Sequence, residues 1–151
     1  SLGKWFNENV DPHWTELRCR LMELLSEEAS LEEIVKLVGM DALSPADRLK
    51  MEAARSIRED FLHQLAFHEV DTYSSLKKQD LMMRLVLAYY DMASDALKLG
   101  ANIDKLASVP SREAVGRFKY VKEDDIDEEF RKDIELLSGE IQQAVADKEE
   151  Y

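Results

Sequence analysis

Apolar side chains recur at helical spacing through most of this 151-residue chain. Between residues 45 and 64, for example, Leu49, Ala53, Ile57 and Phe61 follow one another at every fourth position, which places them on one face of an α-helix. β-branched residues are few, and no segment alternates apolar and polar residues long enough to indicate a strand. The chain is therefore predicted to be all-α, a helical bundle of about five to six helices.

Residues typical of helix ends divide this pattern into segments. Gly39 is expected to end one helix in a left-handed conformation, and Ser44-Pro45 is expected to begin the next. No linker is long enough to separate two domains, so residues 1–151 are predicted to form a single domain. After a short N-terminal piece, Leu2 to Val10, the first three helices are expected from Asp11 to about Ala29, from a capping Ser30 to Val38 and from Pro45 to about Gln64. Two more are expected from a capping Ser75 to near Gly100 and from Ile103 to Ala107. A turn or two follow Ser111, and a last helix is expected from about Asp125.

Composition narrows the classes of partner. The net charge of −12 argues against nucleic acid and anionic membrane surfaces, because both need a basic surface, and it favours a basic partner protein. Cys19 is the lone cysteine, so an internal disulfide is excluded and a reducing compartment is favoured. Neither a signal peptide nor a long apolar run is present, so direct membrane insertion is not expected.

The sequence lacks a complete catalytic set. No two of its five glycines fall within five residues of each other, which excludes both common glycine-rich phosphate loops. Asp60 and His63 have the carboxylate-x-x-His spacing of helical metal sites, but a second copy is missing. The prediction is therefore no catalytic residue, no metal site and no cofactor held by this chain alone, and the chain alone is expected to be inactive.

Two stretches stand out from the helical pattern. In "VGMDALSPAD", residues 38–47, Met40 and Leu43 lie between two helix ends, where they can fill a core or contact another molecule. In "REDFLHQLAFHEVDTYSS", residues 58–75, the rings of Phe61, Phe67 and Tyr73 flank a helix end. Such rings can close a core or stack on a nucleotide base, and spacing alone leaves both alternatives open.

These stretches carry a family resemblance. The segment "LVGMDALSPADRLKMEAARSIREDFLHQLAFHEVDTYSS", which begins at Leu37, resembles the C-terminal region of the catalytic A subunit of archaeal A-type and vacuolar V-type rotary ATPases. That family typically reads "VG.DAL" and then "REDFLQQNAF..VDTY". The front of the chain, "KWFNENVDPHWTELR", is also similar to the family, and the tail, "FRKDIELLSGEIQQAV", more loosely so. The loop "GMDALSPAD" further resembles "GMDELSEED" in the β subunit of the related F-type enzyme.

The resemblance implies that the chain is the C-terminal domain of a larger subunit whose nucleotide-binding domain lies upstream. The phosphate-binding lysine, the magnesium-holding residues and the catalytic glutamate would lie in that upstream domain, so ATP or ADP with Mg is the ligand of the full subunit. Gln64, Ala66 and Phe67 match the positions that contact adenine in the family. His63 and Leu65 depart from the pattern, since the family has Gln and Asn there.

The resemblance also implies partners and a role. The domain would couple ATP hydrolysis or synthesis to rotation and proton transport, peripheral to the cell membrane on its cytoplasmic side. Its partners would be the upstream nucleotide-binding domain, the non-catalytic B subunit and the central stalk. The alternatives are a free-standing acidic helical adaptor that binds a basic protein and, less favoured, an independent enzyme. The residues expected to face the rotor are Gly39, Met40, Asp41, Ala42, Leu43 and Ser44.

Overall fold

The computed structural model of the chain describes residues 13–62 and 75–148, and these residues form helices and turns without any strand. The all-α prediction is confirmed. None of the described helices is long and apolar enough to cross a membrane. The expected N-terminal piece, Leu2 to Val10, lies outside the described residues. The α-helices are α2 (Trp14–Val38), α3 (Pro45–Ile57), α5 (Leu76–Lys98), α6 (Ile103–Ala107), α7 (Ser111–Arg117) and α8 (Ile126–Asp147), and the short elements are the 3₁₀ helices η1 (Met40–Ala42), η3 (Phe118–Tyr120) and η4 (Glu123–Asp125) and the π-helix η2 (Arg58–Leu62).

The predicted helix break between Ala29 and Ser30 is wrong, because α2 continues through both residues. No Gly or Pro occurs within α2, so the backbone has no residue that would force it out of helical geometry. The helix is also held to the domain here: Glu28 is buried and accepts two hydrogen bonds from the Arg58 guanidinium, at 3.0 and 2.7 Å. A serine caps a helix only where the chain leaves helical geometry, so Ser30 is an exposed mid-helix residue.

The start of α3 follows the sequence prediction, and its end does not. The Ser44 hydroxyl accepts a hydrogen bond from the Asp47 amide at 3.1 Å, with Pro45 in the first turn. The α-helix ends at Ile57 rather than near Gln64, and the chain continues to Leu62 as η2. This wider turn begins at Arg58, the residue whose guanidinium binds Glu28 of α2. The predicted cap of α5 is also confirmed, since the Ser75 hydroxyl accepts from the Lys78 amide at 3.0 Å.

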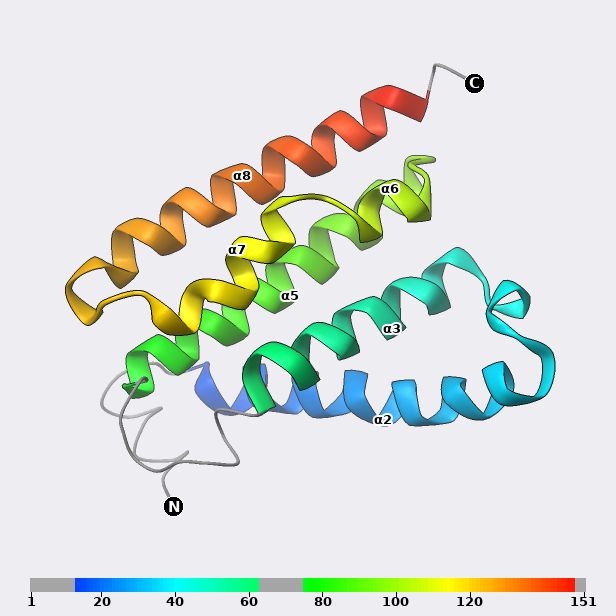
Figure 1. Ribbon diagram of the computed structural model, residues 1–151, viewed down its shortest axis with the longest axis horizontal. Coiled ribbons are helices and arrows are strands. Elements are labelled where there is room, and N and C mark those ends of the chain that lie inside the picture. The colour runs from blue at the N-terminus through cyan, green and yellow to red at the C-terminus, as the bar shows by residue number, and fades with distance from the viewer. Residues whose placement is uncertain (1–12, 63–74, 149–151) are drawn as a thin grey trace.

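Helix α5 lies at the centre of the domain. It packs against the α2–α3 hairpin on one side and against α7 and α8 on the other (Figure 1). The predicted stripe of Leu49, Ala53 and Ile57 on α3 is buried, which confirms it. Apolar residues at helical spacing are buried on two further helices as well; they are Leu81, Leu85, Tyr89 and Ala96 of α5, and Leu137 and Ile141 of α8.

Helices α5 and α8 run in the same direction (Figure 1). Near their N-terminal ends the Lys77 ammonium lies 2.7 Å from the Asp127 carboxylate. At the opposite ends the Lys148 ammonium donates to the Leu99 carbonyl at 2.5 Å. Helix α7 and the 3₁₀ turns carry the chain back between them, whereas α2 and α3 form an antiparallel hairpin. The loop that closes this hairpin therefore lies at the end of the domain opposite to the start of α5.

Candidate functional site

The loop between α2 and α3, residues 39–44, is held by hydrogen bonds at both ends. Gly39 has φ +89°, a left-handed backbone value that favours glycine, and its amide donates to the Val35 carbonyl at 2.8 Å. Within the loop the Leu43 amide donates to the Met40 carbonyl at 3.1 Å, which closes η1. The Ser44 cap then fixes the start of α3. The loop is thus a defined structure between two helix ends, as its sequence indicates.

The two apolar side chains of this loop point in different directions. Leu43 is 7% exposed and belongs to the core, whereas Met40 is 45% exposed. Gly39, Asp41, Ala42 and Ser44 are exposed as well. Of the two alternatives for the loop, core filling applies to Leu43, and contact with another molecule remains available to the other five predicted residues.

Met40 is part of a larger exposed apolar surface that includes the last turn of α2. Ile34, Leu37 and Val38 are 43%, 84% and 63% exposed, and they lie on neighbouring positions of the helix surface. We call Ile34, Leu37, Val38 and Met40 the tip surface. It holds four of the eight large apolar side chains that are exposed in the described part of the chain. Apolar side chains clustered in this way at one end of a domain mark an interaction site more often than single exposed ones do.

The residues predicted to contact adenine, Gln64, Ala66 and Phe67, lie outside the described residues. The described chain stops just before them, at Leu62 of η2. We call residues 39–44 the tip loop. Since α3 begins at Pro45 and η2 continues it, one helical segment connects the tip loop with Leu62, two positions ahead of Gln64 (Figure 1).

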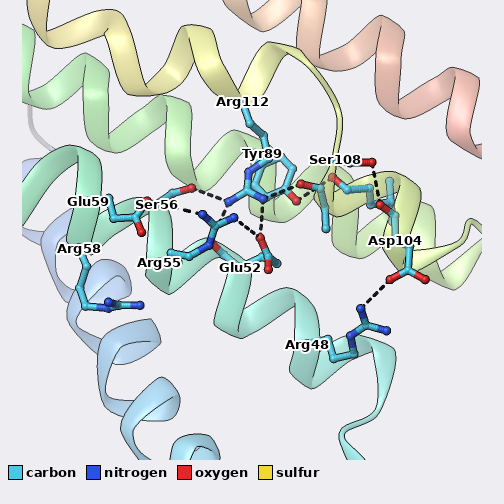
Figure 2. Close-up of polar contacts among 12 residues, drawn as sticks. Arg48, Glu52, Arg55, Ser56, Arg58, Glu59, Tyr89, Asp104, Ser108 and Arg112 are labelled. Carbon is cyan, nitrogen blue, oxygen red and sulfur yellow. Dashed lines mark hydrogen bonds and ion pairs between the residues drawn. The ribbon is translucent and has the colours of Figure 1, made fainter. Parts of the chain in front are cut away.

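A polar cluster lies at the middle of α3, where Arg112 of α7 reaches across to it (Figure 2). One guanidinium nitrogen donates to the Glu52 carboxylate at 2.6 Å and to the Ala107 carbonyl at 2.7 Å. The other donates to the Glu52 carbonyl at 3.0 Å and to the Ser56 hydroxyl at 2.7 Å. The guanidinium carbon also lies 4.7 Å from the centre of the Tyr89 ring of α5. We call Arg112, Glu52, Ser56 and Tyr89 the Arg112 cluster.

The cluster is charged and largely withdrawn from water. Burial raises the pKa of the Glu52 carboxyl, but hydrogen bonds from Arg55 and Arg112 outweigh this and lower it below its ordinary value. Burial raises the pKa of Tyr89 to about 12, so its hydroxyl stays protonated and donates to the Leu106 carbonyl at 2.9 Å. The two arginines thus favour the ionised form of the Glu52 carboxylate that lies between them. This arrangement fixes helices relative to one another and holds no reactive group.

Among the residues that the structure describes, no group of three or more His, Cys, Asp or Glu side chains is arranged so that it could hold a metal ion. His63, the histidine of the single carboxylate-x-x-His spacing, lies outside them. Asp60 of that spacing is half-buried beside the backbone of Gly116, and burial raises the pKa of its carboxyl. The described residues therefore offer a contact surface and a structural cluster.

Sequence reasoning missed both the extent of the tip surface and Arg112. The sequence did contain a local pattern that predicts part of the tip surface. When the buried stripe of α2 is continued from Leu31, Val35 lies on the inward face and Leu37 lies on the exposed face. Arg112 had no such signal. Its partners come from α3, α5 and α6, and only the tertiary structure brings them together.

Comparison with known proteins gives consistent matches. Residues 3–107 match the profile of the family described as the C-terminal domain of V and A type ATP synthase. The chain is 51% identical over 145 residues to the V-type ATP synthase alpha chain of Acetivibrio thermocellus, covering 96% of this chain and 25% of that protein. It is 52% identical over 147 residues to the alpha chain of Clostridium novyi, covering 93% and 25%, and 50% identical over 149 residues to that of Thermoanaerobacter pseudethanolicus, covering 95% and 25%.

The chain thus spans about a quarter of the length of the curated relatives that it matches. These relatives are bacterial, so the archaeal part of the resemblance is not supported.

Proposed function

Because the chain belongs to the family of C-terminal domains of V- and A-type ATP synthases, we propose that it couples the nucleotide state of a catalytic alpha chain to the movement of a central rotor. The domain would complete the adenine end of the nucleotide site through Gln64, Ala66 and Phe67, and ATP or ADP with Mg would bind mainly to the upstream domain. It would contact the rotor through the loop of residues 39–44 and through the tip surface, which extends that contact onto the end of α2. Family membership argues against a free-standing acidic adaptor.

The observation that carries this proposal is the exposed tip surface, which is formed by the end of α2 and by Met40 of the defined loop beside it. A loop held by hydrogen bonds at both ends transmits displacement rather than absorbing it. Methionine supplies an adaptable apolar contact, which suits a partner that presents changing faces as it turns. The exposed carboxylate of Asp41 favours a basic partner and would mainly affect the encounter. The proposed setting is a complex with the B subunit and the central stalk, peripheral to the cytoplasmic side of the membrane, that transports protons.

Replacing Leu37 and Met40 together with serine tests the rotor contact. In the assembled complex, the number of ions transported per ATP hydrolysed is expected to fall about two-fold or more. The reason is that substitutions at residues that transmit coupling between two sites change the coupling free energy by about 0.5–2 kcal/mol. Both side chains are exposed, so the melting temperature of the domain should change little, in keeping with surface substitutions of about 0.5 kcal/mol or less. The measurement is ion transport and ATP hydrolysis in the same membrane vesicles.

Leu136→Ser is the matched control, because Leu136 is 44% exposed on α8 at a position away from the tip. It should leave the number of ions transported per ATP hydrolysed, which we call the transport ratio, unchanged. A tip variant that couples normally would show that these side chains make no functional contact. A large fall in melting temperature would instead assign them to the core.

Phe67→Ala tests the adenine contact. In the full alpha chain it should weaken nucleotide binding about 5- to 150-fold, because stacking of a base on an aromatic ring contributes about 1–3 kcal/mol. Phe67→Tyr keeps a ring for stacking and should bind nucleotide nearly as well as the wild type. If Phe67 belongs to the core instead, alanine would cost about 3–5 kcal/mol of stability, and thermal melts of the domain would show it.

A further inference from the structure

Arg112 ties α3 to three other elements with one side chain. It donates four hydrogen bonds, of which three go to α3 and one goes to the end of α6, and it lies over the Tyr89 ring of α5 (Figure 2). Its side chain is only 11% exposed. A planar guanidinium satisfies several acceptors at fixed angles, whereas an ammonium group acts as a point charge. The position therefore holds α3 in a definite place and orientation.

The part of α3 that Arg112 contacts lies between the two regions of the proposed function. The helix begins at the tip loop and continues through η2 to Leu62, directly ahead of the predicted adenine contacts. Glu52 and Ser56 lie within it, and one of the bonds from Arg112 goes to the Glu52 backbone carbonyl. A bond to the backbone restrains the path of the helix itself, and not only that of a side chain.

The other polar attachments of α3 differ from this one. Arg48 reaches Asp104 of α6 at 2.6 Å, but the Asp104 side chain is 71% exposed, and exposed ion pairs contribute little. Arg58 binds Glu28, but this pair joins η2 to α2, within the same hairpin. Among the described contacts, Arg112 is thus the largely buried polar link between α3 and the α5–α7 side of the domain.

We propose that Arg112 is a positioning residue for coupling: it fixes the middle of α3 against α5, α6 and α7, so that displacement of the tip loop reaches the far end of α3 as movement of one rigid unit. This inference rests on the proposed function. Without the attachment, α3 keeps its apolar core contacts and the exposed Arg48–Asp104 pair on this side of the domain, and we expect displacement at the tip to be dissipated within the domain.

The test uses the assembled complex and the number of ions transported per ATP hydrolysed. Arg112→Met keeps the apolar stem and removes the guanidinium, while Glu52 keeps its bond from Arg55. We expect the transport ratio to fall about two-fold or more in the Met variant, with hydrolysis retained. Arg112→Lys should restore only part of the ratio, because it keeps the charge without the planar fork. Arg48→Ala is the matched control, an arginine of α3 itself in an exposed pair, and should couple normally.

A purely structural role predicts a different result. Loss of folded complex lowers hydrolysis and transport together, so the ratio would stay unchanged, and that outcome overturns the proposal. If the Met variant fails to assemble, Ser56→Ala decides, because it removes a single bond to Arg112: a reduced ratio supports the proposal and a normal one overturns it. The tip variant separates the two proposals. If the variant with serine at Leu37 and Met40 lowers the transport ratio while the Arg112 and Ser56 variants do not, the rotor contact stands and only the positioning role of Arg112 is overturned. If the Leu37 and Met40 variant couples normally, both the rotor contact and the positioning role are overturned.

Discussion

Asparagine in place of Asp133 is expected to make the domain more stable at about pH 8 and to leave its stability nearly unchanged at about pH 4. Asp133 of α8 is 1% exposed, and neither of its carboxylate oxygens has a hydrogen-bond partner within the described part of the chain. Burial raises the pKa of this carboxyl to about 7, and the nearby Glu129 carboxylate adds to the rise, while Lys132 and Arg117 act in the opposite direction. The protonated form is therefore the one that suits the folded state.

The sign of the pH dependence follows from this raised pKa. The ordinary pKa of an aspartate is 3.8, so between that value and about 7 the folded chain holds a proton that the unfolded chain has lost. The contribution of Asp133 to stability is complete below the lower value and is lost as the pH rises through the upper one. The slope reaches at most about 1.4 kcal/mol per pH unit. Asparagine has no proton to lose and removes this slope.

The measurement is urea unfolding of both proteins at several pH values between about 4 and 8. Asp124→Asn is the control, because it removes the same charge from an exposed position in η4. It should leave the pH dependence of the wild type in place. Parallel stability curves for the wild type and the Asp133 variant would mean that this carboxyl does not titrate in the folded state over the range.

Truncation of Phe118 to alanine is expected to cost about 3–5 kcal/mol of stability, the usual loss for a buried phenylalanine. Phe118 is fully buried in η3, the 3₁₀ helix that directly follows α7, and it belongs to the central hydrophobic core. Its removal leaves a cavity that a helix-lined core can close only in part. Chemical unfolding of the domain measures this loss as a lower midpoint with an unchanged slope.

Tyr120→Ala is the matched control, two positions further along the same 3₁₀ helix. Its ring is 66% exposed and lies beside the Lys119 ammonium, which is 5.4 Å from the ring centre. Its loss should change the free energy of unfolding by about 0.5 kcal/mol or less. Equal losses in the two variants would show that η3 as a whole, and not the buried ring, governs the effect.

Local sequence patterns were sufficient to predict most of the helices. The caps at Ser44 and Ser75 and the stripe of Leu49, Ala53 and Ile57 depend on residues close to one another in the chain, and the structure confirms them. The predicted helix start at Ser30 was wrong because it also rested only on residues close to one another in the chain. Its capping spacing is local, whereas α2 is held here by the bonds between Glu28 and Arg58 of η2, a contact between segments 30 residues apart.

The parts of the candidate site that sequence reasoning missed depend on contacts between distant segments. Arg112 meets Glu52 across a separation of 60 residues, and no local pattern marks that pairing. The short α7 and η3 present too few residues for a stripe, so burial of Phe118 could not be foreseen. The tip loop could be identified from its helix-end residues and its family resemblance, but the inward turn of Leu43 came from the structure.

The parallel arrangement of α5 and α8 has a consequence for the order in which the domain folds. Parallel neighbours cannot be joined by a tight turn, so the pairs Lys77–Asp127 and Leu99–Lys148 close separations of 50 and 49 residues. The α2–α3 hairpin closes only 30 residues through Glu28 and Arg58. Closing a longer loop costs more chain entropy and slows folding. We infer that the hairpin forms early and that α8 docks late onto α5. Substitutions on α8 would then act mainly by speeding unfolding, whereas those between α2 and α3 would slow folding itself.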